Sequence, residues 1–304
     1  PNILAHARLV TTDVGATALG AGATWLFVML ARSGRWRYAA AAGLGLGLAA
    51  LAKFSMLLLF ALWPLVALVF AVARRRQPGR LKRLVGAVMR AGLLVSVSLV
   101  TINLGYLGEQ TGQPLGSFEF TSALLTRPVS PTFQPGNDLI DTVRRNRVNR
   151  FRGTWLERVP VPLPRYFVQG FDDQKFEAEG VPARWFDPTA KEGEVTGYPV
   201  YLNGELRGSG WRTYYLYCLL YKVPESTLLL WVSAAAVAVL ARRARSSWPE
   251  EFALGLVPTA VFLAMTFGTD INIGLRYVLP MFPYLCISTG RLAPWAAGLA
   301  FRAR

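Results

Sequence analysis

FSMLLLFALWPLVALVFAVA, residues 54–73, is a run of 20 residues without a charged side chain, and arginines follow it at residues 74–76. A helix needs roughly 20 apolar residues to cross about 30 Å of hydrocarbon. The run therefore predicts a membrane-spanning helix with a positively charged end. Similar apolar runs lie before and after it: residues 14–31, 38–52, 85–105, 219–241, 252–268 and 277–290, with a partial eighth at 292–301.

The composition of the 304-residue chain agrees with several spans. Hydrophobic residues make up 53% of the chain, and its mean hydropathy is +0.32. A soluble protein with a large core could reach such values, but here the apolar residues are clustered into runs of membrane length. The predicted fold class is an all-α, multi-span membrane protein with about seven transmembrane helices and a mixed, loop-rich insert.

The insert covers residues 106–212 and separates the membrane helices of residues 1–105 from those of residues 213–304. It carries 13 Lys and Arg residues and 13 Asp and Glu residues, so its net charge is zero. The net charge of +15 therefore comes entirely from outside the insert. A protein that binds nucleic acid would collect basic residues on its one large polar domain. We therefore expect no nucleic-acid partner.

The basic residues also predict the orientation in the membrane. They cluster after the first, third and fifth runs: Arg32, Arg35 and Arg37; Arg74, Arg75, Arg76, Arg80, Lys82 and Arg83; Arg242, Arg243 and Arg245. If every run crosses, all these clusters lie on one side, and loops rich in Lys and Arg are typical of the cytoplasmic side. Residues 1–13, the insert and residues 269–276 are then expected on the outer side.

Cysteine, histidine and the N-terminal residues add a few limits. Cys218 and Cys286 lie in or beside apolar runs, so they predict no extracellular disulfide framework and leave the redox compartment open. His6 is the single histidine, which excludes a histidine-rich zinc site within this sequence. The chain begins at Pro1 without a charged leader, and we expect it to be a fragment of a longer membrane protein.

The segment GLGLGLAALAK, residues 43–53, is rich in glycine. A phosphate-binding glycine loop needs a strand before it and a helix after it, whereas Ala and Leu surround these glycines. Close packing between helices through small residues explains the segment better. Lys53 follows at its outer end and either extends to the membrane interface or contacts a phosphate.

The first motif on the outer side is PNILAHARLVTTD, residues 1–13. Its last residue, Asp13, precedes a span directly and could simply supply a negative charge to the start of that helix. His6 and Arg8 make the segment polar and mixed in charge, so it could instead hold a divalent metal ion or a phosphate.

The second outer motif is YLNGELRGSGWRTYYLYCLLYKVP, residues 201–224. Most of its aromatic residues fit a belt at the membrane interface. Lys222 lies just inside the apolar boundary, where its amine either extends to the interface or pairs with an anion.

The third outer motif is GTDINIGLRYVLPMFPY, residues 268–284, in which Asp270, Asn272 and Tyr277 accompany Arg276. Arginine offers planar donors that match phosphate oxygens. A topology charge is the alternative, but basic residues prefer the opposite, cytoplasmic side. The position therefore favours phosphate binding by Arg276.

The insert itself has few periodic stretches. Residues 138–152 show roughly helical spacing and could lie along the membrane surface, with their arginines towards lipid headgroups. VPVPLPRYF, residues 159–167, is predicted to be an extended strap, because its alternate prolines fix φ and remove hydrogen-bond donors. The acidic residues between 172 and 194 have no recognisable metal-ligand spacing.

Four segments together carry a resemblance: PNILAHARLVTTD, GLGLGLAALAKFS, YLNGELRGSGWRTYYLYCLLYKVP and NIGLRYVLPMFPYL. In this order they resemble the bacterial relatives of protein O-mannosyltransferases and aminoarabinose transferases, the family 39 type of membrane glycosyltransferases with the C-type fold. The resemblance implies an inner-membrane enzyme that transfers a sugar, with inversion, from a polyprenyl phosphate to a lipid, glycan or protein acceptor. Transfer is expected on the outer, periplasmic face.

The resemblance also implies roles for particular residues. Asp13 matches an acidic residue of an outer loop near the site, where it could bind a metal ion together with His6. Lys53, Lys222 and Arg276 match the cations that hold the donor phosphate. Glu205 lies in a family-like segment without an assigned step. The principal catalytic acid of the family is expected before residue 1, so this sequence alone should be inactive, and the insert is expected to select the acceptor.

Two other function classes remain as alternatives. A transporter would carry charged residues or Gly and Pro breaks in the middle of its spans, whereas here ionisable residues sit at span ends, with Arg90 as the exception. Pro258, Pro280 and Pro283 keep this class open. A non-catalytic membrane anchor, with the insert as an interaction domain, is the second alternative.

Overall fold

The computed structural model describes residues 11–75, 78–129, 133–185, 187, 189–191, 194–197, 199–240, 248–293 and 297. The chain divides into two compact units. The first comprises Pro1–Thr101, Tyr215–Met265 and Gly274–Arg304, and the second comprises Ile102–Tyr214 and Thr266–Ile273. The loop before Arg276 therefore belongs to the second unit, although the residues on both sides of it belong to the first.

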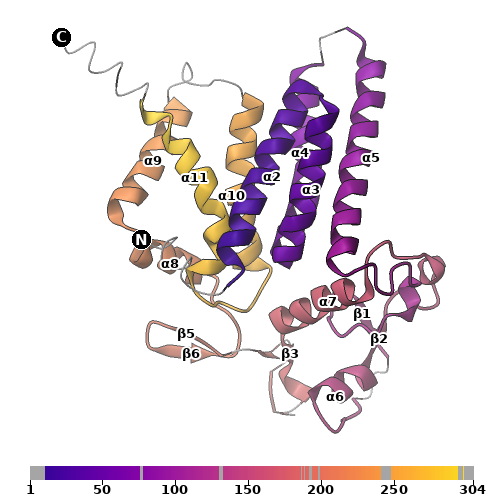
Figure 1. The fold of residues 1–304 in the computed structure, drawn as a ribbon. Helices are drawn as coiled ribbons and strands as arrows, with labels where there is room; N and C mark the ends of the chain where they lie inside the picture. The colour runs from indigo at the N-terminus through magenta and orange to yellow at the C-terminus, as the bar shows by residue number, and fades with distance from the viewer. Residues whose placement is uncertain are drawn as a thin grey trace. The chain divides into compact units, whose positions relative to one another are not determined.

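Long apolar helices dominate the first unit (Figure 1). Among the described residues, four helices are long and apolar enough to cross a membrane: α2, Asp13–Ser33; α4, Leu58–Ala73, with the 3-10 turn η1, Phe54–Leu57, before it; α5, Arg80–Gly105; and α10, Trp248–Phe267. A fifth span results if α8, Tyr214–Lys222, and α9, Glu225–Leu240, count as one span with a bend of 114°. The chain is thus a mainly helical protein with the features of a membrane-embedded one.

The predicted count of seven spans is not confirmed. Residues 36–52 form α3, Trp36–Ala52, whose 17 residues are fewer than the roughly 20 of a typical span. Residues 277–290 are divided between the 3-10 helix η6, Leu275–Met281, and the short helix α11, Phe282–Thr289. Pro280 lies inside η6, and proline lacks the N–H that a continuous α-helix would need. Most of residues 292–301 lie outside the described part of the chain.

Glycines bring α3 close to its neighbours. A Cβ atom on Gly43 would lie 2.4 Å from the carbonyl oxygen of Leu94 in α5, and one on Gly45 would lie 3.0 Å from Ala23 in α2. The first distance leaves no room for a Cβ atom unless the backbone shifts, and the second is tighter than most Cβ contacts in proteins. The prediction that this segment packs between helices is therefore confirmed, since it continues a helix and forms no loop.

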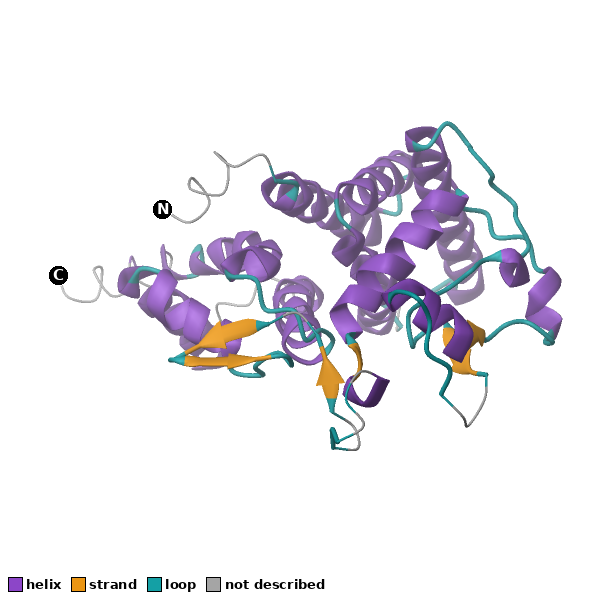
Figure 2. Cartoon of the chain, turned by 90° about the horizontal axis from the view of Figure 1, so that it is seen from below, coloured by secondary structure: helices purple, strands orange, loops and turns teal. Residues whose placement is uncertain are grey.

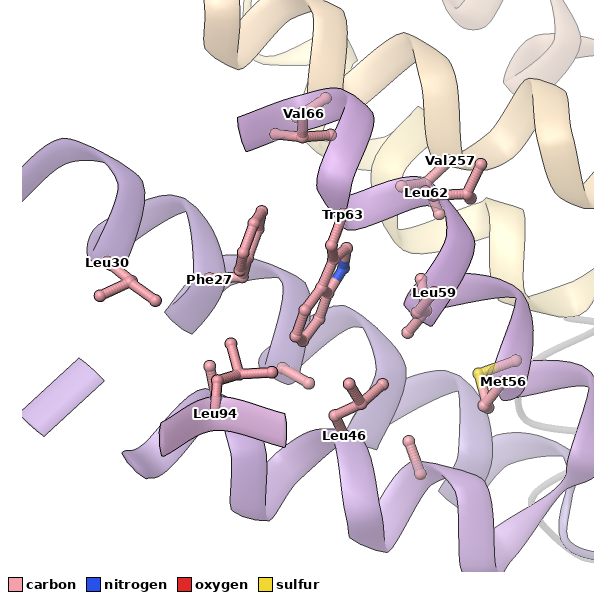
Figure 3. Packing of buried hydrophobic residues seen from close by; sticks show 14 of the residues in the cluster. Phe27, Leu30, Leu46, Met56, Leu59, Leu62, Trp63, Val66, Leu94 and Val257 are labelled. Carbon is pink, nitrogen blue, oxygen red and sulfur yellow. The ribbon is translucent and has the colours of Figure 1, made fainter. Parts of the chain in front are cut away.

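Aromatic and aliphatic side chains fill the space between these helices (Figure 3). Phe27 of α2 stacks on Trp63 of α4, with ring centroids 4.5 Å apart. One turn earlier in α2, Thr24 Oγ1 accepts a hydrogen bond from the Tyr284 hydroxyl of α11 at 2.9 Å. The first helix of the described chain is therefore held by elements from both ends of the sequence.

One end of this unit is strongly basic. Arg74, which follows α4, donates from its guanidinium to the carbonyl oxygens of Ala31 at 2.5 Å and of Arg32 at 2.8 Å. Arg32 in turn forms an ion pair of 2.9 Å with Glu250 in the first turn of α10. The first two predicted basic clusters thus meet at one end, while Arg242, Arg243 and Arg245 lie outside the described residues.

The second unit contains short elements (Figure 2). Its strands form three two-stranded antiparallel ribbons: β1, Thr126–Pro128, with β2, Arg147–Asn149; β3, Val181–Pro182, with β4, Val195–Thr196; and β5, Val200–Leu202, with β6, Glu205–Arg207. Its helical elements are α6, Leu139–Asn146; α7, Arg165–Glu179; and the 3-10 turns η2, Leu115–Ser117, η3, Trp155–Arg158, and η4, Ala183–Trp185.

Two predicted segments of the insert are shorter than expected. The helix predicted over 138–152 begins where the Asp138 carboxylate accepts from Asp141 N, but it ends at Asn146 because β2 pairs with β1. The strap predicted over 159–167 ends at Pro164, since α7 begins at Arg165. Proline is well suited to precede a helix because its missing N–H would have no partner there.

A buried carboxylate organises the interior of the second unit. Asp172 of α7 is 1% exposed and accepts from Thr121 N at 2.6 Å, Thr121 Oγ1 at 3.0 Å and Ser122 N at 3.1 Å. Buried polar groups need such partners, because an unmade hydrogen bond is costly away from water. The loop before β1 is therefore fixed on α7.

Candidate functional site

A cavity of about 250 Å³ opens at the end of the first unit where α2 begins and α3 ends. Its lining comes from three separate stretches of the chain: Thr11, Thr12, Asp13, Lys53, Arg276 and Tyr277. Four charged residues were predicted to take part in catalysis or phosphate binding. Three of them, Asp13, Lys53 and Arg276, line this cavity although they are far apart in the sequence. The basic end around Arg74 lies at the other end of the same helices.

Asp13 is the first residue of α2 and is only 5% exposed. A carboxylate at this position favours the helix because it lies at the positive end of the helix dipole. Its closest partner, however, is the Lys53 ammonium, which donates to Asp13 Oδ1 and forms an ion pair with it. Asp13 thus has a second partner beyond its own helix.

Lys53 owes its position to a break in the helix. α3 ends at Ala52, Lys53 adopts an extended backbone conformation, and η1 begins at Phe54. Its side chain is 11% exposed and lies between the Asp13 carboxylate and the ring of Tyr277, whose centroid is 4.5 Å from Nζ. The lysine therefore points into the cavity, in contrast to one that extends along a lipid-facing surface.

Arg276 reaches the cavity from the start of η6. Gly274 before it has φ 79°, a left-handed conformation that suits glycine, and this turn leads the chain into η6. The Arg276 guanidinium lies 5.5 Å from the centroid of Tyr277. Within the described residues it forms no ion pair with a carboxylate. Tyr277 therefore lies beside both cations.

The lining has a net positive charge, because two cations face one carboxylate. Lys53 is already paired with Asp13, so Arg276 contributes the excess charge. The Thr11 hydroxyl is buried in this lining beside the Asp13 carboxylate. A guanidinium, an ammonium and a hydroxyl around one cavity are donors that match the oxygens of an anion such as a phosphate.

A divalent metal ion fits this lining less well. Asp13 is its one carboxylate, and an ammonium already occupies that carboxylate. No group of three metal-ligating side chains occurs among the residues that the structure describes. His6 and Arg8, the other candidates of the first motif, lie outside those residues.

Lys222 does not line the cavity. It is the last residue of α8 and its side chain is exposed. Its assignment to the donor phosphate therefore stays a prediction from the sequence.

Three further candidates lie in the second unit and act locally there. Glu205 of β6 is exposed and forms an ion pair of 3.1 Å with Arg207. Asp270 donates its backbone N–H to Ala178 O at 2.9 Å, and Asn272 Oδ1 accepts from Trp211 N at 2.5 Å. These bonds fasten residues 268–273 to other segments of the same unit.

Sequence reasoning missed the partnership of Asp13 with Lys53 and the threonines beside Asp13. One signal was available for the pair: an acid that begins one helix and a base that ends the next antiparallel helix lie at the same end. Thr11 and Thr12 belong to the motif that was singled out, but hydroxyl residues before a helix are usually ascribed to capping. No side-chain cap bond from Thr12 occurs here.

No family model, curated protein or solved structure matches this chain.

Proposed function

We propose that this chain is part of a membrane glycosyltransferase that uses a polyprenyl-phosphate-linked sugar as donor and a lipid, glycan or protein as acceptor. The observation that carries the proposal is the convergence of Asp13, Lys53 and Arg276 on one cavity at the end of the helices. Asp13 and Lys53 are nearly buried, and charged side chains shielded from water are costly unless they have partners or a function. Arg276 forms no ion pair in direct contact with a carboxylate among the described residues, so an anionic ligand would be a natural partner for it.

The reaction would use these cations on the leaving group. The acceptor oxygen bonds to the anomeric carbon from the face opposite the phosphate, which inverts the configuration. The bond from that carbon to the phosphate oxygen breaks, and the phosphate leaves with the electron pair, so that its negative charge increases. Arg276 and Lys53 would stabilise this charge as it develops.

Asp13 is assigned a positioning role in this proposal. Its carboxylate pairs with Lys53 and so orients the ammonium towards the cavity. A carboxylate held in this way is a poor acceptor for the proton of an incoming hydroxyl. We therefore assign the general base to a residue outside the described lining.

The basic end of the helices supports an outer location for the cavity. Arg32 and Arg74 lie at the end of α2 and α4 that is opposite to Asp13. Loops rich in Lys and Arg favour the cytoplasmic side, so the Asp13 end would face outwards. The enzyme would then work on the periplasmic face of a bacterial inner membrane.

The position of Arg90 argues against a transporter. It is the one ionisable residue that was predicted inside a span, and a transporter would need such a residue to line the pathway of its substrate. A Cβ atom on Gly34, in the turn after α2, would lie 3.6 Å from its guanidinium, and Trp36 lies beneath it at 5.9 Å. Arg90 therefore belongs to the basic end.

The proposal is tested with the full-length protein in vesicles and labelled sugar on a polyprenyl phosphate. Arg276→Ala should lower the transfer rate about 100-fold, the usual effect of removing one donor to a developing negative charge. Arg75→Ala removes the same charge from an exposed position at the basic end and should leave the rate unchanged. Equal rates for wild type and Arg276→Ala would contradict the proposed phosphate site.

Failure of the folded wild-type protein to transfer sugar from any such donor would contradict the enzyme assignment itself. Uptake assays with the same vesicles would then examine the transporter class. Correct insertion is verified for each variant by protease protection of the second unit.

A further inference from the structure

One segment of the second unit is bound to the end of a candidate membrane span. Residues 155–164, here called the interface strap, begin with η3 and lead into α7. The side chain of Asn103, two residues before the end of α5, donates from Nδ2 to Pro162 O at 3.0 Å. The interface strap therefore lies at the level of the last turn of α5.

Main-chain hydrogen bonds hold the interface strap there. It runs antiparallel to the chain that leaves α5: Gly112 N donates to Val161 O at 2.9 Å, Val161 N to Gln113 O at 3.0 Å and Leu115 N to Val159 O at 3.0 Å. The Asn103 Oδ1 atom also accepts from Thr111 Oγ1 at 2.5 Å. Both sides of this ribbon are thus fastened to the same residue of the helix.

The depth of the interface strap follows from α5. This helix is one of the four candidate spans and ends at Gly105. If α5 crosses the bilayer, its last turn lies where hydrocarbon gives way to headgroups. A segment at the level of Asn103 must then lie in that interfacial layer too.

The sequence of the interface strap suits this layer. In VPVPLP, residues 159–164, apolar side chains alternate with prolines. Proline has no N–H to leave unsatisfied, and the N–H groups of Val159 and Val161 are bonded within the unit. The segment therefore exposes few donors that would need water.

The large apolar residues around the interface strap are exposed in this structure. Trp155 is 81% exposed, Leu107 just after α5 is 93% exposed, and Tyr166 at the start of α7 is 48% exposed. Tryptophan and tyrosine prefer the membrane interface because a ring is combined with a polar group. Arg158 beside them is exposed and could meet lipid phosphates.

We propose that the interface strap lies in the headgroup layer of the outer leaflet and that Trp155 inserts among the lipids. The lipid surface, with its apolar upper chains and anionic phosphates, is the committed partner. This contact would hold the second unit to the bilayer independently of the sugar chemistry proposed above. It rests on α5 being a span.

α6 is the rival membrane contact in this unit, because Leu139 and Ile140 are 42% and 40% exposed. Its best-buried apolar residue, Val143, is nevertheless used inside the unit, where it packs with Phe176 and Val181. α6 also shows no described bond to the last turn of α5. The interface strap is therefore the better candidate.

The test uses single cysteines labelled with a fluorophore in the full-length protein. Trp155→Cys, Ile140→Cys and Leu104→Cys are made in a Cys286→Ser background, where the remaining Cys218 is buried. Leu104 is 69% exposed within α5 and reports whether this helix end is in lipid. The vesicles contain phosphatidylcholine and phosphatidylglycerol, with or without bromine near the carbonyl end of the acyl chains.

Brominated lipid should quench the labels at 104 and 155 and leave the label at 140 nearly unchanged. Quenching at 104 without quenching at 155 would overturn the proposal, as would equal quenching at 155 and 140. Absence of quenching at 104 would also overturn the proposal, because it would show that the end of α5 is not in lipid. Trp155 is mostly exposed, so its replacement should not disturb folding, and monodisperse elution of each variant verifies this.

Discussion

At the scale of single residues, the ion pair between Asp13 and Lys53 has the largest energetic consequences. Both side chains are nearly buried, with exposed fractions of 6% and 11%. A buried pair contributes little compared with an apolar pair, but removal of one partner leaves an uncompensated charge. Replacing one of the two residues should therefore destabilise the protein much more than replacing both together.

Asp13→Asn is expected to lower the free energy of unfolding by about 3–5 kcal/mol, because Lys53 loses its carboxylate. Asp13→Asn with Lys53→Met should recover much of that loss but not sugar transfer. Thermal unfolding in detergent measures the first effect, and the vesicle assay measures the second.

Arg32→Gln is the matched control, because it breaks an ion pair in which the arginine is 56% exposed. Its effect should stay below about 1 kcal/mol, as for most surface pairs. Similar losses for Asp13→Asn and Arg32→Gln would mean that the pair in the cavity has no special stability.

At the scale of elements, the packing of α3 can be tested through its glycines. A Cβ atom on Gly47 would lie 2.6 Å from Thr101 Cβ and 2.9 Å from Ser98 O, both in α5. Gly47→Ala should therefore destabilise the protein by about 1–3 kcal/mol, the usual cost of overpacking. The midpoint of thermal unfolding is the measurement.

Gly15→Ala in α2 provides the comparison, since a Cβ atom there would meet nothing within 4 Å. Alanine is the better helix former, so this variant should be neutral or slightly more stable. If Gly47→Ala were as stable as Gly15→Ala, the close approach of α3 to α5 would be wrong.

Elements that depend on local sequence were predictable, and those that depend on distant partners were not. α4 with η1 covers the predicted 54–73, because a long apolar run needs no information from elsewhere. The predicted helix over 138–152 was too long, since its end is set by pairing between β2 and β1. The predicted span at 277–290 ignored the effect of Pro280 on its first turns.

The candidate site was partly predictable for the same reason. Asp13, Lys53 and Arg276 were each selected from charge at a span end, and the structure brings these together. Lys222 met the same criterion, but the direction of α8 leaves it exposed. Sequence position gives the end of a helix and says little about the direction in which a side chain points.

At the scale of the whole molecule, a substitution inside the second unit should lower the stability of that unit and leave the helices of the first unit unchanged. Asp172 holds three donors in the interior of the second unit, so Asp172→Asn should lower the stability of that unit by about 1–3 kcal/mol. Hydrogen exchange should show faster exchange within residues 115–185 and unchanged exchange in α2 and α3.

The neighbouring Asp173 supplies the control, because its replacement should raise the stability of the second unit at neutral pH, whereas replacement of Asp172 should lower it. Burial and the nearby Asp172 carboxylate raise the pKa of Asp173 above its usual value. A raised pKa in the folded state means that this residue favours folding at low pH and disfavours it once pH exceeds the folded value. Asp173→Asn should therefore stabilise the second unit at neutral pH and lose that effect in acid. A loss of stability at neutral pH would contradict it.

The separation of the cavity lining along the chain has a consequence for biogenesis. Asp13 and Lys53 belong to neighbouring helices, so this neutral ion pair can form between α2 and α3 while translation continues. Arg276 is synthesised only after the whole of residues 102–214, α9 and α10. The cavity thus gains its net positive charge late, and under the proposed function an incompletely translated chain would be inserted without being able to hold the donor.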